Sequence, residues 1–107
     1  MDKMTIKRIN KIFADIKLEV ELFGKENDIT WKRIKKREFY ISNTFRYDGH
    51  YIILFKSYNT IVGFVDCSEK IFYEIGKYSR TTSKQMTQIY NMLFSADYTR
   101  VFVPLEV

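Results

Sequence analysis

The chain has 107 residues, of which 46% are hydrophobic and 17% aromatic, and this is enough to form one compact domain with its own core. Its single proline and four glycines exclude a linker or a disordered tail. Eighteen lysines and arginines against thirteen acidic residues give a net charge of +5, which suits a nucleic acid or an acidic protein as partner.

The cysteine count and the lack of long apolar segments both favour the cytoplasm. Because Cys67 is the only cysteine, no internal disulfide can form and a reducing compartment is favoured. The N-terminal residues lack the apolar stretch of a signal peptide, and no apolar run approaches the ~20 residues that cross a bilayer. We therefore expect a cytoplasmic protein that does not bind membranes.

The first expected element is a helix over residues 5–23. Its apolar residues recur at helical spacing, namely Ile6, Ile9, Ile12, Phe13, Ile16, Val20 and Phe23. Residues 16–22 also alternate as a strand does, so a helix that gives way to a strand stays open. We favour one helix, with Gly24 as its C′ residue.

From Glu38 onward the hydrophobic period becomes two, which predicts four short strands joined by three turns. These strands lie at about 39–46, 51–55, 61–65 and 70–75. Asp48-Gly49 predicts a type I′ hairpin turn, and Asn59 can adopt the left-handed conformation in the second turn. Gly63 marks a bulge or a close approach of another segment. The pattern is that of an antiparallel meander.

The C-terminal part predicts a helix and a last strand. Thr82 and Gln85 match a capping box at the helix start, and the residues that follow form an apolar stripe suited to one sheet face: Met86, Ile89, Tyr90, Leu93 and Phe94. Residues 98–103 predict a strand at a sheet edge. The expected fold is thus a single α+β domain over residues 1–107, with an N-terminal helix, a four-stranded antiparallel meander, a packed C-terminal helix and a final short strand.

Catalytic signals are weak. His50 is the only histidine, and it lies beside the expected hairpin turn, where catalytic residues are uncommon. One cysteine and one histidine cannot complete a closed zinc site, and the chain has no glycine-rich phosphate loop. We therefore expect a protein that is not an enzyme and that has neither a cofactor nor a metal site.

The clearest functional signal is a basic run beside the single tryptophan, and it is either a short helix or an extended lead into the sheet. Its residues are Trp31, Lys32, Arg33, Lys35, Lys36 and Arg37. Such cations can neutralise phosphates, and Trp31 can stack on a base or anchor a protein interface. A solvated segment whose Trp31 and Ile34 cover the core explains the run equally well.

Arg80 and Lys84 flank a series of hydroxyl side chains at the start of the C-terminal helix. A helix N-terminus with basic neighbours can bind an anion, although capping alone accounts for the hydroxyls. With the basic run, Arg80 and Lys84 complete the candidate partner-binding residues.

Two motifs, SYNTIVGF at Ser57–Phe64 and YSRTTSKQ at Tyr78–Gln85, resemble those of small phage and mobile-element proteins of Gram-positive bacteria. The resemblance covers residues 38–94, and Gln85 stands where those proteins usually have a histidine. It implies a phage or prophage protein that works in the cytoplasm of the bacterial host, and it carries no catalytic residues. Small phage proteins of this kind are often inhibitors of host defence that act by stoichiometric binding, anti-CRISPR proteins among them.

These observations lead to an expected non-enzymatic inhibitor of a host defence nuclease, with a Cas9-type complex as the concrete candidate and its RNA or DNA as part of the bound surface. A basic nucleic-acid-binding accessory protein is the alternative. A subunit of the phage particle, paired through the edge strand Arg100–Val103, is a third hypothesis. We expect a monomer or a weak dimer.

Overall fold

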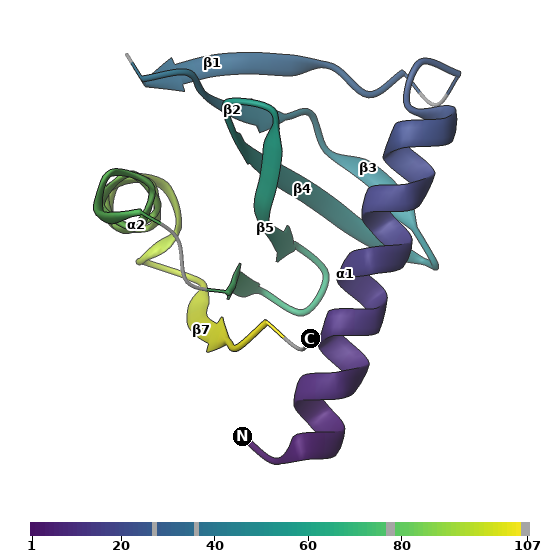
Figure 1. Cartoon of the computed structure of the whole chain (residues 1–107), viewed down its shortest axis with the longest axis vertical. Helices are drawn as coiled ribbons and strands as arrows, with labels where there is room; N and C mark the ends of the chain where they lie inside the picture. Colours follow the sequence, from purple (N-terminus) through teal and green to yellow (C-terminus); the bar gives the residue numbers. More distant parts are fainter. Residues whose placement is uncertain (27, 36, 77–78, 106–107) are drawn as a thin grey trace.

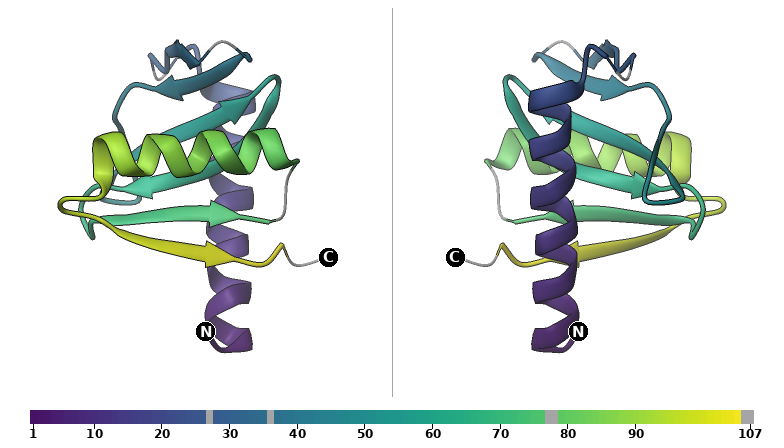
Figure 2. Two further views of the ribbon diagram at one scale, coloured as in Figure 1. Left: turned by 90° about the vertical axis from the view of Figure 1, so that its left-hand side faces the viewer. Right: turned by 90° about the vertical axis from the view of Figure 1, so that its right-hand side faces the viewer.

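A computed structural model describes residues 1–26, 28–35, 37–76 and 79–105. The chain forms one sheet with helix α1 (Lys3–Phe23) on one face and helix α2 (Arg80–Ile89) on the other (Figure 1). The two views of Figure 2 show each helix in turn lying in front of the strands. The α+β class expected from the sequence is confirmed.

Helix α1 is continuous over Lys3–Phe23, which rules out a strand at residues 16–22. Its N-cap is Asp2, whose Oδ1 accepts a hydrogen bond of 2.7 Å from the Thr5 N–H. The helix ends at Phe23, and Gly24 is its C-cap with a right-handed φ of −56°. The expected C′ role is therefore wrong, because the Gly24 N–H continues the helical hydrogen bonding to the Val20 carbonyl oxygen. Its core-facing residues are Ile9, Phe13 and Ile16. The helical spacing of the apolar residues, not the alternation at residues 16–22, therefore predicts the structure of this segment.

The sheet has the order β1-β2-β4-β5-β6-β7, with β3 paired to β4. The strands are β1 (Trp31–Lys35), β2 (Phe39–Ser42), β3 (Phe45–Tyr47), β4 (His50–Ser57), β5 (Thr60–Asp66), β6 (Ile71–Ile75) and β7 (Thr99–Val103). The pairs from β1 to β6 are antiparallel, whereas β7 returns beyond α2 and pairs with β6 in parallel. The expected first meander strand is divided into β2 and β3, and the basic run adds β1.

The turns agree with the sequence except at one position. Asp48 and Gly49 both have positive φ angles, 47° and 79°, as a type I′ turn requires. In the next turn Tyr58 adopts the left-handed φ of 54°, not Asn59. The reason is the register, which pairs Ser57 with Thr60 and puts Tyr58 in the first central position, where type II′ turns need a positive φ.

Gly63 lies at a crowded point of the sheet. A Cβ there would come within 2.5 Å of the Tyr73 carbonyl oxygen and 2.9 Å of Met86 Cε on α2. The β4–β5 register also shifts between Phe55, which pairs with Gly63, and Lys56. Both the expected bulge and the close approach are therefore present.

Helix α2 begins earlier than the sequence suggested. Its N-cap is Ser79, whose Oγ accepts a hydrogen bond of 3.2 Å from the Thr82 N–H. Thr82 points inward, with its Oγ1 3.1 Å from Ser57 Oγ on β4, and Gln85 is buried. The expected capping box of Thr82 and Gln85 is therefore wrong, because an upstream hydroxyl caps the helix and frees Thr82 to anchor it to the sheet.

After Ile89 the helix continues as a π-helical turn, η1 (Tyr90–Phe94). Met86, Ile89 and Phe94 are buried as the apolar stripe predicts, but Leu93 is 58% exposed. The wider turn changes the angular spacing of side chains, and this turns Leu93 away from the sheet.

The core has two parts, one on each face of the sheet. Ile9, Phe13 and Ile16 of α1 pack against Leu54 and Phe64, and an aromatic cluster fills the α2 side around Phe39, Phe55, Phe72, Met86 and Phe94. Arg100 on β7 joins the layers, because its Nη2 lies 2.6 Å from Glu74 Oε2 on β6 and 3.0 Å from Thr87 Oγ1 on α2. None of the described helices has the length and apolarity that a membrane crossing requires.

Candidate functional site

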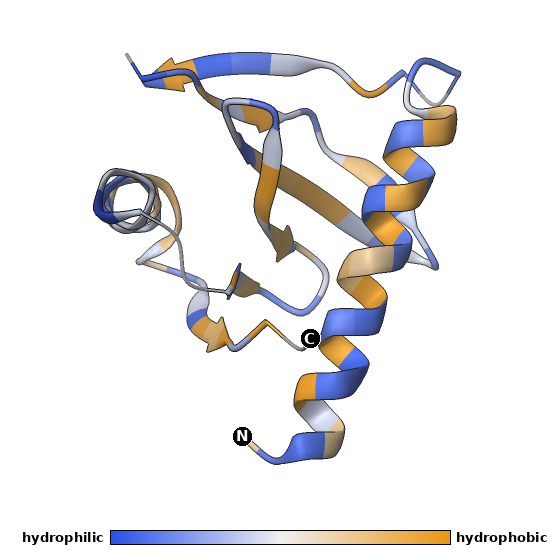
Figure 3. Ribbon diagram, in the orientation of Figure 1, coloured by the Kyte–Doolittle hydropathy of each residue, from blue (hydrophilic) through white to orange (hydrophobic). Residues whose placement is uncertain are grey.

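The basic run forms the edge strand β1, which pairs only with β2 in the described sheet. The run is therefore extended over Trp31–Lys35, and Arg37 lies beyond the strand. Lys32 and Arg33 are exposed, and Figure 3 shows β1 as mainly hydrophilic, in contrast to the apolar β4. Lysines on an edge strand also discourage pairing with other chains. Lys36 lies outside the described residues.

The side chains of β1 face both sides of the sheet. Ordinary alternation places Trp31 against the α1 side of the core and Ile34 against the α2 side, and the register shift between Arg33 and Lys35 then breaks this alternation. Lys35 also lies on the α2 side, where its Nζ is 4.0 Å from Met92 Sδ of η1. The basic run therefore does not act as one surface.

On the α2 side, three cations from two distant parts of the sequence line one groove of about 510 Å³. Lys35 is the last residue of β1, Arg37 lies two residues after it, and Lys84 lies in the first turns of α2. Thr81, Gln85 and Gln88 complete the lining. Hydroxyl and amide groups together with cations are the side chains that contact phosphate oxygens in nucleic-acid complexes. We call this surface the basic groove.

Gln85 has an unusual environment in the basic groove. Only 6% of its surface is exposed, and its Oε1 has no hydrogen-bond partner among the described residues. An unpaired buried polar atom costs about 1–3 kcal/mol, and such atoms are rare in folded proteins. The sequence pointed to Gln85 as a member of a capping box and as a departure from the histidine of similar proteins, so its place in a groove was not foreseen.

The other predicted site residues that the structure describes do not line the groove. Trp31 is half-buried, and the Lys56 ammonium lies 4.2 Å from the centre of its ring, so one face of the indole is already occupied. Arg80 is exposed at the first position of α2, and Lys32 and Arg33 are exposed on β1. Of the eight candidates, the structure brings Lys35, Arg37 and Lys84 together.

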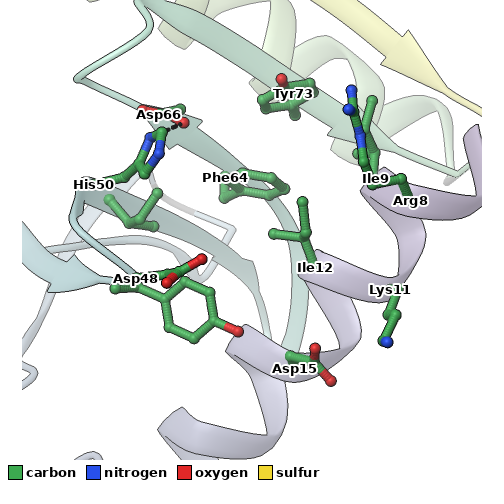
Figure 4. A pocket seen from close by; sticks show the side chains of 12 residues that line it. Arg8, Ile9, Lys11, Ile12, Asp15, Asp48, His50, Phe64, Asp66 and Tyr73 are labelled. Atoms are coloured by element: carbon green, nitrogen blue, oxygen red, sulfur yellow. Dashed lines mark hydrogen bonds and ion pairs between the residues drawn. The ribbon is translucent and has the colours of Figure 1, made fainter. Parts of the chain in front are cut away.

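A second hollow of about 310 Å³ lies between α1 and the β3–β4 hairpin (Figure 4). His50 Nδ1 is 2.8 Å from Asp66 Oδ2, while Asp66 Oδ1 accepts hydrogen bonds of 3.0 Å from the Ser68 and Glu69 N–H groups. Burial, followed by the nearby Asp66 carboxylate, raises the pKa of Tyr73 in the same wall. Asp66 therefore holds both the turn after β5 and the His50 ring.

His50 was expected to be an isolated hairpin residue, and Asp66 was missed, although the antiparallel register places both at the same end of the β4–β5 pair. The alternating pattern of β5 could have placed Asp66 on the same face as its neighbours in the pocket, but it could not supply the contact. A carboxylate that orients a histidine can assist proton transfer. Separately, no three His, Cys, Asp or Glu side chains in the described ranges are grouped to hold a metal ion. The contacts of Asp66 explain the pair structurally, because they connect the start of β4 to the turn after β5.

Comparison with known proteins gives one match. A family model described as "Family of unknown function (DUF8033)" matches residues 18–102. No curated protein and no solved structure matches the chain. The matched range includes both β1 and α2, the two elements that form the basic groove.

Proposed function

The chain belongs to DUF8033, a family of unknown function, and we propose that it is a non-enzymatic binding protein whose basic groove contacts the phosphate backbone of a nucleic acid. The convergence of Lys35, Arg37 and Lys84 in one groove carries this proposal. Each cation that neutralises a phosphate releases counterions, so that binding weakens as salt rises. Three such contacts correspond to a slope of log K against log salt of about −2 to −3.

The proposed target is the nucleic acid of a host defence nuclease, with a guide-loaded Cas9-type complex as the concrete case. Such a complex holds a guide–target heteroduplex in a positively charged channel and leaves a displaced strand to be bound. The motifs at Ser57–Phe64 and Tyr78–Gln85, which resemble those of small phage proteins, support a protein that inhibits by stoichiometric binding in the cytoplasm of a bacterial host. The net charge of +5 is consistent with this target.

The test is DNA cleavage by several bacterial Cas9-type complexes at increasing ratios of this protein. We expect cleavage to fall as the ratio approaches equivalence, and the variant Lys35→Glu/Lys84→Glu to lose most of the inhibition. Lys25→Glu/Lys70→Glu makes the same charge change at exposed positions outside the groove and should inhibit normally. Unchanged cleavage by every nuclease at excess protein would reject the defence-nuclease target.

The alternative is an accessory protein that binds free nucleic acid, which the same three cations favour. The two proposals are distinguished by measuring the binding of this protein to labelled single-stranded RNA and DNA by fluorescence anisotropy at low and moderate salt. Binding to free strands that is as tight as binding to the nuclease complex supports the accessory role. If neither free strands nor complexes bind, the groove is not a phosphate site and both proposals fail.

A further inference from the structure

Helix α1 carries its charges in an order that is unfavourable for an isolated helix. The N-terminal half has only basic side chains after the cap, Lys3, Lys7, Arg8 and Lys11, whereas acidic side chains predominate from Asp15 onward, with Glu19 and Glu21. The macrodipole favours the opposite order, with anions near the N-terminus and cations near the C-terminus. No charged side chain of α1 forms an ion pair with another described residue. Among the described residues, the Asp2 carboxylate at the N-cap offsets part of this unfavourable order, and the charges along the rest of the helix remain without an ion-pair partner.

The outer face of α1 also exposes apolar side chains. Met4, Leu18 and Leu22 are 84%, 55% and 60% exposed, on the side opposite the residues that pack on the sheet. The exposed Lys11 and Asp15 lie along the same stripe, at the edge where it meets the hollow beside the β3–β4 hairpin. In the right-hand view of Figure 2 no other element lies in front of this helix. The stripe is therefore open to a partner along the whole helix, which spans about 31 Å.

We propose that two copies of the chain associate through this outer face of α1, with the helices antiparallel about a two-fold axis at the level of Phe13. Residues of the outer face at equal distances from Phe13 then meet across the axis. Lys11 of one copy lies opposite Asp15 of the second copy, and Met4 lies opposite Leu22. Each pair occurs twice by symmetry, as in any isologous interface. The basic half of each helix thus meets the acidic half of the other, and the adverse order of charges becomes complementary.

Charge complementarity favours a second copy over a polyanion as the occupant of this face. A nucleic acid that followed α1 would be attracted by the basic half and repelled by Asp15, Glu19 and Glu21 along the other half. With few apolar side chains the interface is at the small end of the range for specific contacts, so the dimer is weak and depends on protein concentration. The proposal is independent of the basic groove, which lies on the other side of the sheet.

The test is the oligomeric state by sedimentation equilibrium over a wide concentration range at low and high salt. We expect association of the unmodified chain that weakens with salt. Asp15→Lys should weaken it about tenfold or more, because two like-charge contacts replace two ion pairs. The swap Lys11→Asp/Asp15→Lys restores both pairs and should restore association. Asp97→Lys makes the same charge change at an exposed turn distant from α1 and should associate normally.

A chain that stays monomeric at every concentration overturns the proposal, and so does a swap that fails to restore association. A dimer that survives Leu18→Gln/Leu22→Gln as well as Asp15→Lys uses another surface, such as the β7 edge, and also refutes it. If the chain is monomeric and Lys7→Glu/Lys11→Glu lowers RNA binding, α1 is a polyanion surface instead. Circular dichroism of each variant verifies that the helices remain folded.

Discussion

Arg100 is expected to be the most costly charged residue to remove. Its guanidinium bonds Glu74 Oε2 at 2.6 Å and 3.1 Å and Thr87 Oγ1 at 3.0 Å, and it lies 5.7 Å from the Tyr90 ring centre. The Glu74 side chain is only 8% exposed, against 30% for that of Arg100. Arg100→Met keeps the aliphatic length but leaves a buried carboxylate without its counterion.

The expected loss of unfolding free energy is about 3 kcal/mol. Breaking one partner of a buried pair costs ~3–5 kcal/mol, and the partial exposure of Arg100 places this pair at the lower end. A domain of this size has a total of about 5–15 kcal/mol, so the variant remains folded but is markedly weakened. Arg46→Met removes an exposed arginine from β3 and should cost less than about 1 kcal/mol.

Urea unfolding followed by the fluorescence of Trp31, the single tryptophan, measures these changes. A double-mutant cycle with Glu74→Gln isolates the pair. We expect Glu74→Gln/Arg100→Met to cost clearly less than the sum of the single changes, because removing the carboxylate relieves the buried charge. Additive costs, or a loss below about 1 kcal/mol for Arg100→Met, would refute the role assigned to this ion pair.

Three further predictions concern the packing at Gly63, the N-cap of α2 and the burial of Cys67. Gly63→Ala should lower the unfolding free energy by about 3 kcal/mol, because the new Cβ meets the Tyr73 carbonyl oxygen; a change below about 1 kcal/mol in chemical denaturation would contradict this. Ser79→Ala should cost about 1 kcal/mol through loss of the cap on the Thr82 N–H, whereas Ser79→Asp should retain most of the stability. Burial raises the pKa of the Cys67 thiol, so a thiol reagent should react slowly at neutral pH and faster above the usual pKa range, and rapid reaction of the folded protein at pH 7 would show that the thiol is exposed.

Much of the fold could be predicted from local patterns. The helical stripe from Ile9 to Ile16 specifies α1, and Asp48-Gly49 specifies the hairpin, because both signals depend on residues close in sequence. Strand β1 could not be assigned, since a charged edge strand with a register shift lacks the alternation of a half-buried strand. The cap at Ser79 was missed because several consecutive hydroxyls could each serve.

The candidate site was less predictable because it depends on long-range packing. Lys35 and Lys84 are nearly fifty residues apart, and only the docking of α2 beside β1 brings them into one groove. The side chains of β1 suggested one basic surface, yet the shift after Arg33 separates Trp31 from Lys35. His50 and Asp66 meet for the same reason, through the register of β4 and β5. Composition identified the cations but not the faces on which they lie.

The contact between α1 and β7 has a consequence for the order of folding. Asn10 Nδ2 donates a hydrogen bond of 2.9 Å to the Pro104 carbonyl oxygen. The core-facing residues of α1 pack in one cluster with Val103 and Phe64. These partners are synthesised long after α1, and contacts between residues so distant in sequence slow folding. The hairpins from β2 to β6 can form from neighbouring segments, so the meander is expected to assemble first. Helix α1, although first in the chain, is then expected to dock late.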